Sequence, residues 1–429
     1  MKKNSSFLMY GALVKTSILV LLSSLSFSQT TEKLSIDSCY VYAKNNYPLI
    51  KQQELIANTK SFSLENASKS YFPQLAINGQ VTYQSDVTQI PISLPNFSPP
   101  VISKDQYKLY GEVIQPLTDV AVIHQQKQLI KENAAVEEEK LEVELYKLKE
   151  RINQVYFGIL LIDAQLQQTE LLKKDILSGI KKTEAAYANG TALKSNLNTL
   201  RAELLKTEQR STELKANRKG YMDMLGILIN KPIKETTALE FPAIKSPVQT
   251  INRPELRLFD AQKQTFTAQN KLISAKSIPR LNLFFQSGYG KPALNMLNPD
   301  FNFYYVGGLR LSWNLSVFYT FKKDKKIITI NQDILELQKQ TFLFNTQLQL
   351  TQQEAEFNKL RELIQSDDEI ISLRNSIKIT ANAQLENGTI TVNDYVSYVN
   401  AEDQAKQNKL LHQVQLLLAQ YNSQTVSGN

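Results

Sequence analysis

An internal repeat restricts the fold of this 429-residue chain more than any other feature. Two halves of the sequence carry the same landmarks, and two long intervals agree to the residue. With a period of about 200 residues, this is a duplicated module and not a solenoid of short repeats. The matched intervals are Pro48 to Pro73 and Pro254 to Pro279, of 25 residues each, and Leu117 to Gly190 and Leu315 to Gly388, of 73 residues each.

Each module contains two segments in which apolar and polar residues alternate. A period of two indicates β-strands that present different chemistry on their two faces. The predicted strands are 74–85 and 106–117 in the first module, and 280–290 and 304–315 in the second. Each is about ten residues long, the length of a tilted strand that crosses a bilayer.

Long helices are predicted after the second strand of each module. The chain has only 14 Gly and 14 Pro, about 3% each, so turns must be few and elements long. Apolar residues recur at alternating spacings of four and three, which favours a left-handed supercoil. Helical hairpins are therefore expected over 119–229 and 319–424, and a helix from 121 to 187 alone would span roughly 100 Å. The first heptad stripe comprises Leu141, Leu145, Leu148, Ile152, Val155, Ile159, Ile162 and Leu166.

The chain begins with a stretch that is typical of a secretory signal. Lysines precede an apolar run and a Ser-Phe-Ser cleavage pattern in residues 1–28. The predicted organisation is then repeat 1 over 29–230, a linker over 231–250 and repeat 2 over 251–429. The formal net charge of +8 falls to +5 when the three lysines of the predicted signal are removed, and this charge is too mild and too evenly spread for nucleic acid to be an expected partner.

Few residues are suited to catalysis. His124 and His412 are the only histidines, and Cys39 is the only cysteine, which excludes an intramolecular disulfide. Cys39 is expected to be a buried helix residue. No nucleophile, base and orienting group emerge together, so a hydrolase is a distant alternative. We therefore predict a protein that is not an enzyme, with no cofactor and no metal site.

Four strands cannot close a membrane barrel, because the smallest single-chain barrels use eight and an open edge cannot remain in lipid. Either several copies complete one barrel, or the chain does not enter the membrane. Two copies would give a barrel of eight strands, and side chains fill the interior of a barrel of that size. Three copies would give twelve strands and leave room for a passage. The rival interpretation is a periplasmic coiled-coil scaffold or adaptor without a membrane-embedded barrel.

The sequence resembles the TolC-like outer membrane factors in four features taken together. They are the signal segment, the duplicated strand pairs, the proline before each first strand and the glycine in each long hairpin. The resemblance covers nearly the whole mature chain. It implies a mixed α/β membrane protein, a homotrimer whose twelve-stranded β-barrel lies in outer-membrane lipid and continues into a periplasmic α-helical tunnel. It also implies an exit duct for efflux or export, joined to an inner-membrane transporter through a periplasmic adaptor. Drug efflux, metal efflux and protein export share such a component, so the cargo stays open.

The resemblance also implies site residues. The hairpin turns lie farthest from the strands along the helices, and their residues are expected to contact the adaptor. Members of this family commonly have acidic residues six and nine positions after the glycine of the second hairpin, which is Gly388 here. These residues form carboxylate rings at the periplasmic aperture. Here these positions are Asp394 and Ser397, while the first module has Asn196, so one ring is expected. The alternative is that Asp394 is a solvated residue at a helix start. The expected tip residues are Asn189, Gly190, Thr191, Asn387, Gly388 and Thr389.

Three further predictions concern smaller features. Asn230 stands where the family has glycine at the end of the first hairpin, and asparagine tolerates the left-handed conformation. The lysines within 322–326 are expected either against lipid phosphates or at an ordinary solvated helix start. Aromatic residues at the strand ends favour a membrane girdle, although a soluble sheet would use them in packing. They are Tyr107, Tyr110, Tyr304, Tyr305 and Trp313.

Overall fold

The computed structural model describes residues 33–88, 102–243 and 250–429, so the predicted signal over 1–28 lies outside it. The chain forms two compact units. The first unit comprises the described parts of Met1–Ala43, Ile152–Lys245 and Leu360–Leu418, and the second comprises those of Lys44–Arg151, Ser246–Lys359 and Ala419–Asn429. Each unit draws on both halves of the sequence, so the compact units are not the two predicted repeats. The tandem division stays a prediction.

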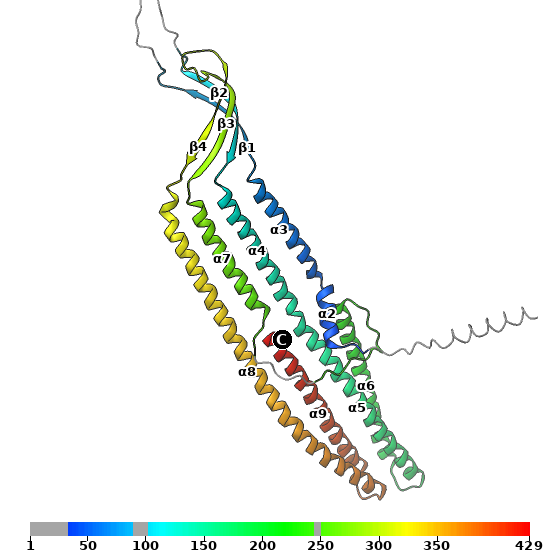
Figure 1. The fold of residues 1–429 in the computed structure, drawn as a ribbon. Helices are drawn as coiled ribbons and strands as arrows, with labels where there is room; N and C mark the ends of the chain where they lie inside the picture. The colour runs from blue at the N-terminus through cyan, green and yellow to red at the C-terminus, as the bar shows by residue number, and fades with distance from the viewer. Residues whose placement is uncertain (1–32, 89–101, 244–249) are drawn as a thin grey trace, which may run out of the picture. The chain divides into compact units, whose positions relative to one another are not determined.

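The second unit contains a four-stranded antiparallel sheet in the order β1-β2-β3-β4 (Figure 1). Its strands are β1 (Gln74–Tyr83), β2 (Asp105–Pro116), β3 (Arg280–Lys291) and β4 (Asn302–Ser312). The central pairing joins the two sequence halves, since Val113 of β2 lies opposite Phe285 of β3. Within the described chain, β1 and β4 each pair on one side only. The sheet therefore has two open edges.

The helices of the second unit form a layer that continues the strands (Figure 1). After a 3₁₀ turn (Pro48–Lys51), α3 (Gln52–Lys69) leads to β1, α4 (Val120–Tyr146) follows β2, and α7 (Pro254–Lys276) leads to β3. The first part of α8 (Val317–Glu386) follows β4. An ion pair between Lys339 and Asp260 (3.0 Å) and a ring contact between Phe259 and Phe342 join α8 to α7.

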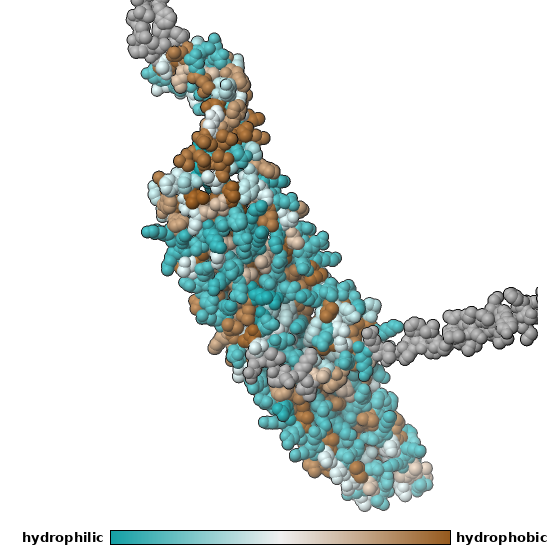
Figure 2. All heavy atoms as spheres, viewed as in Figure 1, coloured by the Kyte–Doolittle hydropathy of each residue, from teal (hydrophilic) through white to brown (hydrophobic). Residues whose placement is uncertain are grey.

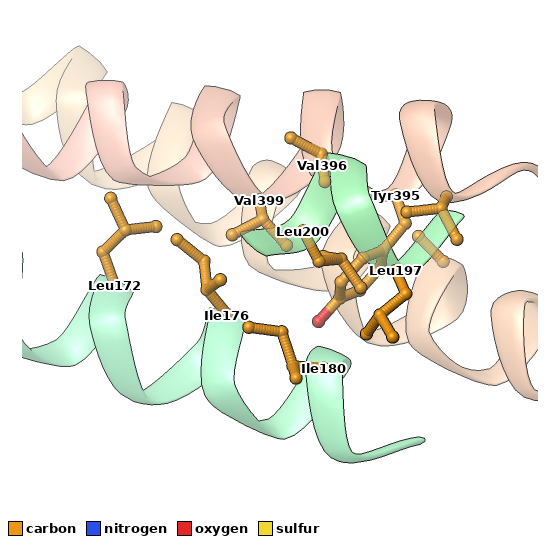
Figure 3. Packing of buried hydrophobic residues seen from close by; sticks show 10 residues of the cluster. Leu172, Ile176, Ile180, Leu197, Leu200, Tyr395, Val396 and Val399 are labelled. Atoms are coloured by element: carbon orange, nitrogen blue, oxygen red, sulfur yellow. The ribbon is translucent and has the colours of Figure 1, made fainter. Parts of the chain in front are cut away.

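The first unit contains most of α2 (Ile36–Asn46), most of α5 (Leu148–Ala188), α6 (Lys194–Ile229), the rest of α8, and most of α9 (Val392–Ser427). Apolar side chains from α5, α6, α8 and α9 point toward one another in one buried cluster (Figure 3). This packing stabilises helices whose individual propensity would not hold them. The cluster consists of Leu172, Ile176, Ile180, Leu197, Leu200, Ala381, Val392, Tyr395, Val396 and Val399.

The first predicted long helix differs from the observed one. α4 ends at Tyr146 and α5 begins at Leu148, so one residue interrupts the expected run, whereas α8 is continuous over 70 residues. Lys147 keeps right-handed helical angles (φ −61°, ψ −19°), so the interruption is slight. At this point Tyr146 Oη donates a hydrogen bond to the carbonyl oxygen of Thr425 (2.8 Å). Burial raises the pKa of Tyr146 to about 12.

Several packing predictions are confirmed. The heptad stripe that starts at Leu141 is buried as far as Ile162, and Leu166 is half-buried. Cys39 lies in α2 with 0% exposure, and this burial raises the pKa of its thiol to about 12. Asn230 ends α6 in the left-handed conformation (φ 50°, ψ 43°), as expected for the residue in the glycine position. Among the described helices, none has an apolar run long enough to cross a membrane.

Candidate functional site

The sheet has one exposed apolar face. Alternation places the odd-numbered residues of all four strands on the same face, because the register pairs odd with odd throughout. Ile77 is 85% exposed there. Figure 2 shows hydrophobic residues gathered over the strands, whereas the visible surface of the helices is mostly hydrophilic. The exposed apolar members are Leu75, Ile77, Val81, Tyr83, Tyr107, Leu109, Leu283, Phe285, Tyr289, Phe303, Tyr305, Leu309 and Leu311.

The opposite face carries a polar network across three strands. Gln286 Nε2 donates a hydrogen bond to Glu112 Oε1 (2.7 Å), and Arg310 Nη1 lies 3.3 Å from the same oxygen. The Arg310 guanidinium also lies over the ring of Phe284, 4.4 Å from its centroid. The alternation in the sequence assigns these residues to the polar face. The pairing of β2 with β3 brings Glu112 to Gln286, and the pairing of β3 with β4 places Arg310 within reach of the same carboxylate.

The aromatic-girdle prediction is wrong for two of its five residues. Tyr107 and Tyr305 are exposed and share the odd-numbered register of the apolar face, while Trp313 is exposed directly after the end of β4. Tyr110 and Tyr304 are even-numbered and face the other way, each opposite Gly288. The period of two in a strand is the physical reason, because neighbouring residues cannot share a face.

The two hairpin turns have the same geometry. Gly190 (φ +76°) and Gly388 (φ +68°) occupy the left-handed position that ends α5 and α8. The amide of Thr191 donates to the carbonyl of Ala186 (2.9 Å), and that of Thr389 donates to the carbonyl of Gln384 (2.9 Å). Each threonine hydroxyl donates to the same carbonyl as its own amide. These bonds form the Schellman arrangement, which satisfies the last carbonyl groups of a helix.

Asp394 lies in the first turn of α9 and forms a reciprocal hydrogen-bonded pair with Thr391, the residue before the helix. The amide of Asp394 donates to Thr391 Oγ1 (3.1 Å), while the amide of Thr391 (3.1 Å) and its hydroxyl (2.6 Å) donate to Asp394 Oδ2. This is a capping box. The hydrogen bonds from the side chain and then the backbone of Thr391 lower the pKa of Asp394. The carboxylate is therefore ionised at neutral pH, and its capping contribution is lost only in acid, as pH falls through that lowered pKa.

The equivalent position in the first hairpin is built differently. Leu193 precedes α6, makes no capping hydrogen bond through its side chain, and is extended (φ −85°, ψ 152°). Asn196, the counterpart of Asp394, donates its amide to the carbonyl of Leu193 (3.1 Å). The two turns match, but only the second carries a capped carboxylate.

The first unit also holds charged residues in its interior that the sequence did not single out. Glu402 is 2% exposed and is paired with Lys406 and with Lys378 (3.3 Å), which in turn reaches Asp175 (3.0 Å). Burial lowers the pKa of Lys378, but hydrogen bonds and charges from Asp175 and Glu402 outweigh it and raise the pKa. Glu402 and Lys406 are four residues apart on α9, a spacing that the sequence shows, but Lys378 and Asp175 lie on two other helices, so no local pattern associates them with Glu402.

Among the described residues, no group of three or more His, Cys, Asp and Glu side chains could hold a metal ion. The predicted tip residues and Asp394 do not come together in one site. None of their contacts conflicts with the predicted roles. Their assignment to an aperture and a docking surface therefore remains a proposal.

The chain is similar to known proteins in its structure, and no similarity is found through its sequence. No model of a known protein family matches this sequence, and no curated protein matches it. The fold is similar to that of the outer-membrane channel OprN, with a TM-score of 0.67 and 12% identity over 92% of this chain and 89% of OprN. It is similar to CusC, with a TM-score of 0.66 and 13% identity over 91% of each chain.

A third similar structure is the CmeC outer membrane channel of Campylobacter jejuni. The TM-score is 0.63, with 11% identity over 92% of this chain and 85% of CmeC. All three similarities extend over both sequence halves. The chain therefore has the fold of the outer-membrane channels, which is the fold that its resemblance to the TolC-like outer membrane factors implied.

Proposed function

We propose that this protein is the outer-membrane exit duct of a tripartite efflux or export system. It is a passive channel, has no catalytic role, and is coupled to an inner-membrane transporter through a periplasmic adaptor. The observation that carries this proposal is the sheet with one exposed apolar face and two open edges. Similar structures described as outer-membrane channels support it.

Three copies close the barrel in this proposal. An open sheet edge is not tolerated in hydrocarbon, because its N–H and C=O groups would have no partner. Pairing β4 of one copy with β1 of the next satisfies both edges, and repetition around a threefold axis gives twelve strands. Such a barrel is wide enough for a passage, whereas eight strands are filled by side chains.

The outer helices of the second unit support the same assembly. The face of α8 carries an exposed apolar stripe at spacings of three, four and seven, and α3 exposes Leu55 and Phe62 seven residues apart. Heptad stripes of this kind are covered when helices supercoil. The stripe on α8 comprises Ile327, Ile330, Ile334, Leu337, Phe344 and Leu348.

In the closed barrel the apolar face contacts lipid and the polar face lines the passage. Glu112, Gln286 and Arg310 then lie inside, where water is present and a charge pair is tolerated. The helical part of the chain lies in the periplasm. A periplasmic scaffold without a barrel is the less favoured alternative, because an apolar face of this extent exposed to water promotes association.

We propose that the matching hairpin turns, with Asn189, Gly190 and Thr191 in one and Asn387, Gly388 and Thr389 in the other, contact the adaptor. Their shared geometry supports this proposal, because a trimer would present six near-equivalent turns to a ring of adaptors.

Mass measurement and conductance test the proposed function together. We expect the purified protein in detergent to have the mass of three chains, and we expect it to conduct ions after insertion into planar bilayers. A folded monomer or dimer as the only species, or a trimer that never conducts, would contradict the proposal. Stable extraction in buffer without detergent would favour the scaffold.

Asp394 is proposed to form one carboxylate ring at the periplasmic aperture. Three ionised carboxylates near a common axis attract cations, so Asp394→Asn should reduce block by polyvalent cations and raise the resting conductance modestly. Planar-bilayer recordings measure both quantities. Thr391→Ala is the matched control, because it removes the capping hydroxyl and keeps the charge. If Asp394→Asn conducts and is blocked like wild type, Asp394 serves only as a helix cap.

A further inference from the structure

Each strand of the sheet meets a helix at one end (Figure 1), and the residues beside these four junctions share one chemical pattern. At each junction an apolar side chain is exposed beside the strand, and basic side chains lie in the nearest turns of the adjoining helix or, for Arg280, at the first residue of β3. The exposed apolar residues are Phe72, Leu117, Ile278 and Trp313. The basic residues, here termed the junction belt, are Lys69, Lys127, Lys276, Arg280, Lys322, Lys323, Lys325 and Lys326.

The belt is densest where β4 meets α8. Trp313 donates its indole N–H to the carbonyl of Ser277 (3.0 Å), which fixes the ring at the junction, and Phe318 packs edge-on against it (6.0 Å between centroids). The ring of Phe318 also contacts the ring of Phe321, and Lys325 Nζ lies 4.6 Å from the centroid of the Phe321 ring. Aromatic rings followed by lysines are typical of the boundary between hydrocarbon and headgroups.

Acidic residues offset little of this charge. Asp119 lies 3.6 Å from Arg280, Asp324 lies within the lysine run, and Glu65 lies four residues before Lys69 in α3, so three carboxylates accompany the eight basic residues. The opposite ends of the strands are different, since Asp86, Asp105 and Asp300 there accompany Lys104 and Lys291. Positive charge is thus concentrated at the helical end of the sheet, which favours an anionic partner at that end alone.

We propose that the junction belt binds the headgroups of anionic phospholipids in the leaflet from which the helices emerge. This inference rests on the proposed function, because it requires the sheet to lie in a bilayer. Lysine and arginine beside a membrane surface attract anionic lipids, while the exposed rings lie at the level of the headgroups. A trimer would present three copies of the belt, and therefore a basic ring around the barrel.

The belt persists even if another copy covers the apolar stripe of α8. At 100° per residue, Lys325 lies at least about 140° around the helix from both Ile327 and Ile330, whereas Lys322 lies about 140° from Ile327 and about 80° from Ile330. Lys325 therefore remains available when that face is packed, and Lys322 lies at its margin. Lys323 lies on the same face as the stripe, so it is the member most affected by assembly.

Lipid retention tests the inference. Wild type is inserted into vesicles of phosphatidylethanolamine and phosphatidylglycerol in equal amounts and extracted gently, and the lipids that remain bound are measured by mass spectrometry. We expect phosphatidylglycerol to be enriched at least about threefold over its supplied ratio. The test variant changes Lys322, Lys323, Lys325 and Lys326 together to glutamine, and it should lose this enrichment. The matched control changes Lys174, Lys181, Lys194 and Lys215, exposed lysines of α5 and α6, to glutamine and should keep it.

One further variant and one further condition separate charge from folding. Arginine at the same four positions in place of lysine should preserve the enrichment, and 0.5 M salt should weaken it. Equal enrichment in wild type and the four-glutamine variant would overturn the inference. The inference would also be overturned if wild type retained both lipids in the supplied ratio. The same holds if wild type enriched lipopolysaccharide, but not phosphatidylglycerol, from mixed vesicles. A conducting trimer without lipid preference overturns only the belt, whereas failure to form a conducting trimer in any lipid overturns the proposed function.

Discussion

Leu309→Lys is expected to prevent the protein from inserting into membranes. Leu309 lies in β4 on the apolar face and is 64% exposed. In a trimer the substitution places three lysines against lipid, and each costs about 2–4 kcal/mol near the middle of a membrane-spanning strand. Flotation with vesicles and mass measurement in detergent should show little inserted trimer.

Val306→Lys is the matched control for this prediction. Val306 lies on the same strand but on the polar face, opposite Gln286. A lysine there points into the proposed passage, where water solvates it, so trimer and insertion should be retained and ion selectivity should shift. If both variants insert equally well, the apolar face does not contact lipid, and the scaffold alternative is favoured.

Changing both Gly190 and Gly388 to valine is expected to abolish docking of the adaptor while leaving the barrel intact. Both glycines have positive φ, and a left-handed conformation costs an L-residue roughly 1–2 kcal/mol. No atom lies within 4 Å of a Cβ at either position, so the whole effect comes from the backbone of the turns. Because six turns per trimer act together, a modest change at each one gives a large loss of avidity.

A photo-reactive residue at position 389 measures this loss through cross-linking to the adaptor in intact cells. Wild type should cross-link, and the double-valine variant should not, although its trimer and conductance are normal. Gly220→Val is the matched control, because Gly220 lies inside α6, has no positive φ and also has open space around it. Adaptor cross-linking that survives in the double-valine variant would show that the turns are not the docking surface.

The sequence determined the elements of this protein through local periodicity. Alternation in segments such as residues 280–290 indicated strands with one apolar face, because neighbouring strand residues point to opposite sides. Spacings of three and four indicated the buried stripe that starts at Leu141, because helical residues at those spacings share a face. Gly190 and Gly388 marked the turns because few other residues adopt a left-handed conformation.

Only the tertiary structure decided which elements meet. Glu112, Gln286 and Arg310 form a network because β2 pairs with β3 across the two sequence halves. Glu402 meets Lys378 because α8 and α9 pack together. The basic junctions lie at one end of the sheet because its strands are antiparallel and meet their helices at that end. The capping box of Asp394 lies within four residues, but its geometry depends on where α9 begins. Periodicity along a chain fixes which face a residue occupies, whereas contacts between distant residues depend on strand register and helix packing, which no local pattern encodes.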